Sequence, residues 1–336
     1  MTTAISSAPI SRARQVAMYV VREVVSTMSM DAIGQDGNVI YSEGYGTDTE
    51  EPNEEMIRNA ALVAVNSDKV VIVAGLPDSF ESEGYDRTHM RLPRCQNELI
   101  RRVAAANPNT IVVLYNGAPV EMPWIDDVKG VIEGYLGGQA VGAATKAVLW
   151  GAVNPCGRLP ETFPIQLEDN PSWLSYGGEG NTAVYNEGIF VGYRYYDRKK
   201  MKVRFPFGYG LSYTTFTENV EEVTPDYVVV TVTNTGDYSG KNVLQLTISK
   251  PDGKLDHEKK ALAGFAKTKL LAPGESQTLR IPYQLADIAS FDESRSAFIL
   301  EGGVYEIHLN DALCGSILVE ERILETVKPI GSDKCT

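Results

Sequence analysis

Histidine and cysteine are scarce in this sequence, with three and four copies among 336 residues. They are also scattered, since no group of them has the short spacing of metal ligands or of a redox motif. This distribution argues against a zinc site and against a Ser-His-Asp catalytic system. The cysteines fit a reducing, cytoplasmic setting in which they act as small apolar side chains. The residues are His89, His257, His308, Cys95, Cys156, Cys314 and Cys335.

Long apolar runs and basic clusters are also missing. No segment approaches the roughly 18 consecutive apolar residues of a membrane span. The N-terminal segment does not have the basic start and continuous apolar core of a secretory signal, because Arg12, Arg14 and Arg22 interrupt it. This again predicts a cytoplasmic location. The net charge of −13 argues against nucleic acid and an anionic membrane as partners, because binding to either needs clustered Lys and Arg.

The remaining composition is that of an ordinary globular protein, and the length of 336 residues predicts two domains. Between residues 54 and 150, segments with a helical spacing of apolar residues alternate with short aliphatic runs. This alternation predicts an α/β fold, a three-layer αβα sandwich around a mainly parallel sheet. The expected helices are residues 54–67, 96–106 and 140–150, and the expected strands are residues 70–74, 110–115 and 128–135.

The pattern changes at about residue 216, where short β-branched or alternating segments follow one another with turn sequences between them. Such strands predict an antiparallel β-sandwich. We expect strands at residues 227–234, 243–249, 276–283 and 304–309. The predicted domains are the αβα sandwich over residues 31–215, with an irregular connector at 160–215, and the β-sandwich over residues 216–325. Residues 1–30 form a divergent N-terminal segment and residues 326–336 a tail.

The strongest chemical signal is the polar loop that follows the aliphatic run Val70–Leu76. A loop leaving the C-terminal end of a buried parallel strand is where open α/β sheets place their ligand sites. Carboxylates beside aromatic rings at that place favour a polar, ring-shaped substrate, although the segment alone also fits a solvated turn. The side chains are Phe80, Glu81, Glu83, Tyr85, Asp86 and Arg87.

A series of motifs that includes this loop resembles the C-terminal region of glycoside hydrolase family 3 β-glucosidases. The tail resembles the fibronectin type III-like module that ends many members of that family. The resemblance runs in consistent order from about residue 38 to 320. The first set of motifs is Glu83–Arg87, Leu92-Pro93, Ala106–Thr110, Pro119–Trp124, Gly151–Pro155, Gly157–Pro160, Glu187–Tyr196 and Phe205–Tyr213, and the second set is Val232–Gly236, Leu262–Phe265 and Leu271–Glu275.

The resemblance implies a retaining hydrolase that releases terminal β-linked glucose from oligosaccharides or glucosides, with no cofactor and no metal. In such enzymes a carboxylate of the Glu-Gly-Tyr-Asp-Arg segment is the general acid/base, and that position here is Glu83. Glu81 is the rival, because two carboxylates two residues apart cannot be ranked from sequence alone. The candidates for binding the sugar or orienting the loop, the latter by hydrogen bonds and a charge pair, are Phe80, Tyr85, Asp86 and Arg87.

A retaining mechanism also needs a nucleophilic carboxylate about 5–5.5 Å from the first. In the resembled family this nucleophile lies in a separate (β/α)8 barrel, which takes about 250 residues. We therefore expect no nucleophile in this chain, and we expect a barrel domain or chain as a partner beside the β-linked glucoside. The alternatives are a non-catalytic sugar-binding or assembly module, and a truncated fragment that is inactive without a barrel.

The N-terminal segment does not resemble the family's usual entry into the sandwich. Val16, Tyr19, Val20 and Val24 recur at helical spacing. Residues 12–25 are therefore interpreted as a substitute helix or as foreign sequence.

Overall fold

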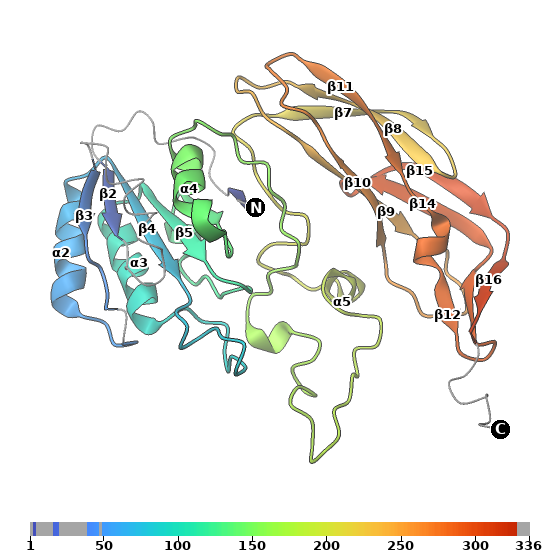
Figure 1. Cartoon of the computed structure of the whole chain (residues 1–336), viewed down its shortest axis with the longest axis horizontal. Helices are drawn as coiled ribbons and strands as arrows, with labels where there is room; N and C mark the ends of the chain where they lie inside the picture. The colour runs from blue at the N-terminus through green and yellow to red at the C-terminus, as the bar shows by residue number, and fades with distance from the viewer. Residues whose placement is uncertain (1–2, 5–15, 20–38, 47–48, 328–336) are drawn as a thin grey trace. The chain divides into compact units, whose positions relative to one another are not determined.

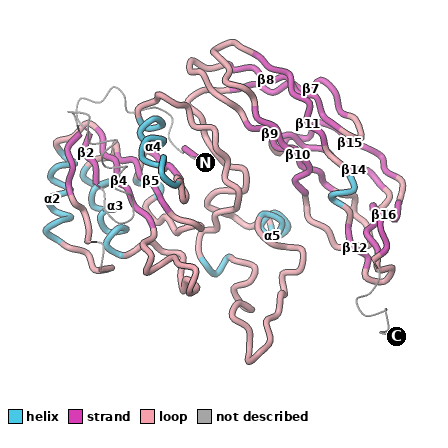
Figure 2. The backbone as a smooth tube through the Cα atoms, viewed as in Figure 1, coloured by secondary structure: helices cyan, strands magenta, loops and turns pink. Residues whose placement is uncertain are grey.

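The computed structural model describes residues 3–4, 16–19, 39–46 and 49–327. The chain forms two compact units, each with its own core. The first unit comprises residues 1–170 and 203–215, and the second comprises residues 171–202 and 216–336. The connector at residues 160–215 is thus divided between the two units. Figure 1 traces the order of the elements, and Figure 2 shows helices and strands in the first unit and mainly strands in the second.

The first unit is built on a sheet with strand order β1-β6-β5-β4-β2-β3. All neighbouring strands run parallel except β1, which is antiparallel to β6. The central strands β4 and β5 are buried along almost their whole length, as is typical of a parallel sheet covered on both faces. The strands are β1 (Thr3–Ala4), β2 (Val16–Tyr19), β3 (Val39–Ser42), β4 (Lys69–Gly75), β5 (Thr110–Tyr115) and β6 (Gly130–Glu133).

Helices cover both faces of this sheet. Alternate residues of each strand point to opposite sides, so each central strand contributes apolar side chains to both faces. On β4, Val70 and Ile72 belong to one core, which they share with helices α2 (Glu54–Val65) and α3 (Arg94–Ala106). Val71 and Val73 belong to a second core, shared with α4 (Val141–Leu149). The predicted three-layer αβα sandwich is therefore confirmed. Short 3-10 turns lie at Ile125–Asp127, Gly138–Ala140 and Leu167–Asp169.

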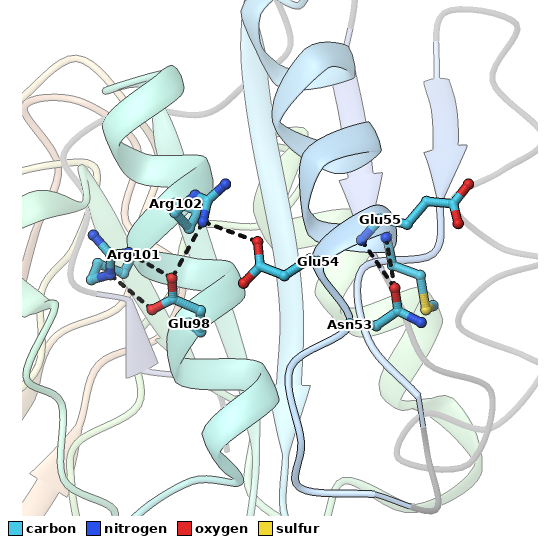
Figure 3. Close-up of polar contacts among 7 residues, drawn as sticks. Asn53, Glu54, Glu55, Glu98, Arg101 and Arg102 are labelled. Atoms are coloured by element: carbon cyan, nitrogen blue, oxygen red, sulfur yellow. Dashed lines mark hydrogen bonds and ion pairs between the residues drawn. The ribbon is translucent and has the colours of Figure 1, made fainter.

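Polar contacts fix the start of α2 and join its first turn to α3 (Figure 3). The Asn53 side chain caps α2 by accepting hydrogen bonds of 3.1 Å from two backbone N–H groups of the first turn. Arg102 of α3 lies 3.4 Å from the Glu54 carboxylate and 3.7 Å from that of Glu98. Exposed ion pairs of this kind contribute at most about 1 kcal/mol each. The apolar contacts of the two helices with the sheet therefore supply most of the stability.

The second unit is an antiparallel β-sandwich, as predicted. Its core lies between a sheet of order β10-β9-β14-β15 and a sheet of order β11-β8-β7, and a third sheet has the order β12-β13-β16. In β8 every second residue is buried, which is the pattern of a strand with one face in a core. The strands are β7 (Phe216–Val223), β8 (Tyr227–Asn234), β9 (Val243–Ser249), β10 (Ala261–Lys267), β11 (Ser276–Pro282), β12 (Ser290–Asp292), β13 (Ala297–Leu300), β14 (Gly303–Leu309), β15 (Ala312–Val319) and β16 (Arg322–Thr326).

Two helical elements complete the second unit. A 3-10 turn lies at Leu285–Ile288, and helix α5 (Tyr193–Lys199) precedes the sandwich. This helix is joined to the sandwich at β10, because the Tyr193 hydroxyl accepts a hydrogen bond of 3.0 Å from the backbone N–H of Leu262. Asp197 of the same helix lies 3.6 Å from the Lys260 ammonium.

The helix expected within residues 12–25 is wrong for the part that the structure describes. Val16–Tyr19 forms β2, which pairs in parallel with both β3 and β4. A short apolar run fits either period, and here pairing with neighbouring strands decides the outcome. The rest of residues 12–25 lies outside the described residues. In the described part of the chain, no helix has the length and apolar character needed to cross a bilayer.

Candidate functional site

The acidic loop leaves the C-terminal end of β4, where a buried glutamine holds the strand end in place. The Gln96 side chain, 2% exposed, donates to the Gly75 carbonyl at 2.9 Å and accepts from the Gly75 N–H at 3.0 Å. The next N–H, that of Leu76, still donates to the Tyr115 carbonyl of β5 at 3.1 Å. The chain leaves the sheet after this bond. The start of the loop is therefore fixed by helix α3 and by strand β5.

The loop then turns back on itself with Glu83 at its tip. The Pro77 carbonyl accepts from the N–H groups of Phe80 and Glu81 at 2.8 and 3.1 Å. Ser82 and Tyr85 form an antiparallel bridge, so Glu83 and Gly84 form the connection between them. The Glu83 side chain is exposed and has no hydrogen bond or ion pair with any described residue.

Glu81 has a different environment, although it lies only two residues away. Its Oε2 accepts a hydrogen bond of 2.7 Å from the backbone N–H of Gly117, in the turn after β5. Arg87, on the other side of the loop tip, donates from Nη1 to the Pro119 carbonyl of the same turn at 3.4 Å. Burial lowers the pKa of the Arg87 guanidinium, and the nearby carboxylates of Glu81 and Glu121 oppose this shift.

The remaining predicted side chains surround a small cavity of about 210 Å³. The Phe80 ring packs against the main core of the first unit and meets the His89 ring edge-to-face, with 5.7 Å between centroids. Tyr85 is 48% exposed, and its hydroxyl donates to the Asp78 carbonyl. Asp86 is exposed, and no ion pair joins it to Arg87 among the described residues. The cavity is lined by Glu50, Ser79, Phe80, Tyr85, Asp86, Arg87, Thr88 and His89.

The structure adds a group of side chains that the sequence analysis did not identify. Glu133, the last residue of β6, is 1% exposed, and Asn116, which follows β5, is fully buried. Glu133 accepts from the Tyr135 N–H at 3.1 Å, and its second oxygen lies 3.5 Å from the Asn116 Nδ2. The Tyr135 hydroxyl donates to Glu161 at 3.3 Å. Buried and partly buried polar groups thus extend from the edge of the sheet towards residue 161.

The electrostatics of this group are set mainly by burial. Burial raises the pKa of Glu133 to about 8, and the nearby carboxylates of Glu161 and Glu81 add to the rise. Burial also raises the pKa of Glu161, again with a contribution from Glu81. Glu81 of the acidic loop thus contributes to the pKa rise of both Glu133 and Glu161.

The rule that located the acidic loop could have located these residues as well. Asn116 directly follows the buried strand β5, and Glu133 is the last residue of the buried strand β6. Both residues therefore lie at the same edge of the sheet as the loop after β4. Glu161 has no comparable signal, because it belongs to an irregular segment. Within residues 39–46 and 49–327, no three His, Cys, Asp or Glu side chains form a potential metal site.

Comparison with known proteins identifies the family. The profile of the glycosyl hydrolase family 3 C-terminal domain matches residues 6–193, more than half of the chain. The chain belongs to glycoside hydrolase family 3. The fibronectin type III-like domain matches residues 242–312 of this family 3 chain, within the β-sandwich. The match to the first domain starts at residue 6, well before residue 38, where the motifs of the sequence analysis begin.

The related proteins are β-glucosidases that are longer than this chain. Thermostable beta-glucosidase B of Acetivibrio thermocellus is 43% identical over 304 residues, which are 88% of this family 3 chain and 40% of that protein. The crystal structure of the Bifidobacterium adolescentis GH3 beta-glucosidase covers 99% of this chain and 53% of its own, with 30% identity and a TM-score of 0.85. The structure of the Kluyveromyces marxianus beta-glucosidase, solved in complex with glucose, matches 82% of this chain and 35% of its own, with 40% identity and a TM-score of 0.77. The chain thus spans about half or less of the length of these relatives.

Proposed function

We propose that this chain carries the acid/base part of a retaining β-glucosidase and that Glu83 is the general acid/base. A (β/α)8 barrel, in the same polypeptide or in another, would supply the nucleophile. The substrate would be a terminal β-linked glucoside or oligosaccharide. The observation that carries the proposal is the position of Glu83 at the exposed tip of a loop anchored on the C-terminal edge of the parallel sheet.

The reaction needs one carboxyl group that gives and then takes a proton. In the first step the Glu83 carboxyl protonates the glycosidic oxygen while the nucleophile of the barrel attacks C1, and the bond from C1 to the leaving oxygen breaks. In the second step the Glu83 carboxylate takes a proton from water, whose oxygen attacks C1 and releases the nucleophile. An exposed side chain without a competing partner can serve both steps once substrate and barrel cover it.

The neighbours of Glu83 have separate roles in this proposal. The ring of Tyr85 is half exposed beside the cavity, so it can pack against a sugar face. Arg87 orients the loop through the Pro119 carbonyl. The cavity of about 210 Å³ is below the usual range of about 300–1,000 Å³ for ligand pockets, which agrees with a site completed by another domain.

Addition of a family 3 barrel domain in trans tests this function. We expect the mixture to cleave an aryl β-glucoside, and we expect Glu83→Gln to lower kcat by about 10²–10⁴-fold, the usual contribution of a general acid/base. Glu55→Gln on the exposed face of α2 is the matched control and should leave the rate unchanged.

Three results would contradict the proposal. Hydrolysis at the wild-type rate by the Glu83→Gln mixture would exclude Glu83 as the acid/base. Hydrolysis at a normal rate by the chain without a barrel would show that the nucleophile does not come from a barrel. Sugar binding that stays the same with and without the barrel, and with no hydrolysis in either case, would instead support the non-catalytic module.

A further inference from the structure

The turn after β5 holds the acidic loop on both sides of its tip. Glu81, before the tip, accepts from the Gly117 N–H at 2.7 Å, and Arg87, after it, donates to the Pro119 carbonyl at 3.4 Å. The turn is itself braced, because the buried Asn116 side chain donates to a carbonyl two residues ahead at 2.9 Å. Two ends of the loop are therefore fixed to one rigid support, and the tip between them carries Glu83.

A side chain at residue 117 would push the Glu81 carboxylate away from its present position. A Cβ atom built there would lie 2.9 Å from Oε1 and 3.3 Å from Oε2 of Glu81. The carboxylate thus lies against the open side of the glycine, with Oε2 on its backbone N–H. This is the geometry of a charge-assisted hydrogen bond, which is stronger and more directional than one between neutral groups.

We propose that Glu81 is a positioning residue that holds the loop so that the Glu83 carboxyl stays in place for proton transfer. This inference rests on the proposed function. It also assigns different tasks to the two neighbouring glutamates: Glu81 binds the protein backbone, and Glu83 acts on the substrate. A misplacement of about 1 Å in a reacting group can cost about 10²-fold in rate, so loss of this contact should be visible in catalysis.

Two substrates and two variants of Glu81 distinguish positioning from proton transfer. A 2,4-dinitrophenyl β-glucoside has a leaving group that needs no proton, whereas cellobiose needs one. In the mixture with a barrel domain, kcat/KM reports the first step, in which only cellobiose needs the proton. Glu81→Ala should therefore lower kcat/KM on cellobiose by about 10²-fold and leave kcat/KM on the dinitrophenyl substrate almost unchanged. Glu81→Gln should restore most of the lost rate, because its amide oxygen can still accept from the Gly117 N–H. A general acid could not be replaced by glutamine in this way.

Gly117→Ala is a second variant that keeps Glu81 and displaces its carboxylate. It should show the same dependence on the leaving group as Glu81→Ala. Amide hydrogen exchange in the chain alone gives a readout that needs no activity. The Gly117 N–H should exchange about tenfold faster or more in Glu81→Ala, the result of losing one hydrogen bond to a charged group, and close to the wild-type rate in Glu81→Gln.

Several outcomes would overturn the inference, and they differ from failure of the proposed function. Equal exchange rates of the Gly117 N–H in wild type, Glu81→Ala and Glu81→Gln would show that the contact between Glu81 and Gly117 does not hold the turn. Equal losses of kcat/KM on both substrates would assign Glu81 a purely structural role. A Glu81→Gln variant as slow as Glu81→Ala on cellobiose would assign it a proton-transferring role. Failure of the proposed function appears elsewhere, as an unchanged rate for Glu83→Gln.

Discussion

Replacement of Glu133 by glutamine should stabilise the first unit, and the gain should grow with pH. Glu133 is 1% exposed at the end of β6. Burial, reinforced by the carboxylates of Glu161 and Glu81, raises the pKa of Glu133 from 4.5 to about 8. Glutamine has nearly the same shape, keeps an oxygen that can accept from the Tyr135 N–H, and has no charge. The substitution therefore removes an ionisation that the folded state disfavours.

The sign and size follow from proton linkage. A carboxyl group whose pKa is higher in the folded state binds protons more tightly there, so folding becomes less favourable as the pH rises through the interval between the two pKa values. Below pH 4.5 the group is protonated in both states and contributes no penalty, and above about pH 8 the penalty is complete. Each pH unit within this interval costs about 1.4 kcal/mol, so at pH 7 the penalty is about 3 kcal/mol. The amide nitrogen of glutamine cannot accept from the Asn116 Nδ2, and loss of that contact would subtract about 1 kcal/mol from the gain.

Urea unfolding of wild type and Glu133→Gln between pH 5 and pH 8 measures this difference. Tryptophan fluorescence is suitable because the buried Trp124 lies in the first unit. The variant should be nearly as stable as wild type at pH 5 and more stable by about 2–3 kcal/mol at pH 7. Glu55→Gln, an exposed change on α2, should show no such trend. A stability difference for Glu133→Gln that is the same at pH 5 and pH 8 would refute the reasoning.

Two further substitutions test how the site is supported. Gln96→Ala removes both hydrogen bonds of a buried amide to Gly75, so it should lower the free energy of unfolding by about 2–4 kcal/mol. It should also speed the exchange of the Gly75 N–H, and unchanged exchange would contradict this prediction. Asn53→Ala removes the cap that accepts from the N–H groups of Glu55 and Met56, so it should lower the free energy of unfolding in urea by about 1 kcal/mol. A variant as stable as wild type would show that the cap contributes nothing.

The central elements of the fold could be predicted closely because their apolar periods are unambiguous. The strand expected at residues 110–115 is β5 itself, and the helix expected at residues 96–106 is α3 with two more residues at its start. The two added residues follow Pro93, the N-cap, which makes no side-chain capping hydrogen bond, so no capping residue marks the helix start. Strand β10 was missed because it contains Gly264 and alanines, which favour strands weakly. Helix α5 is short and lies between glycine and a left-handed Lys200, so its apolar pattern is too brief to detect.

The candidate site was predictable only where a strand end gave a signal. The rule that ligands gather at the C-terminal edge of a parallel sheet indicated residues 80–87, which the structure places at the end of β4. It could not separate Glu81 from Glu83, because the difference depends on Gly117, which is 36 residues away in sequence. The expected charge pair between Asp86 and Arg87 is not formed; the guanidinium instead contacts the Pro119 carbonyl. Contacts between distant segments of this kind follow from the packing of β4 beside β5 and have no local pattern.

The three carboxyl groups Glu83, Glu81 and Glu133 differ most in their access to water, and this difference decides what each can do. A group that exchanges a proton with a substrate must be reachable, which is true of Glu83 at the loop tip. A group buried in the sheet edge, as Glu133 is, bears a high cost for its charge and is mainly neutral at pH 7, since its pKa is about 8. Glu81, held on the Gly117 N–H, adds to the rise in the pKa of Glu133. The sheet edge and the acidic loop are thus coupled electrostatically through Glu81 and Glu133.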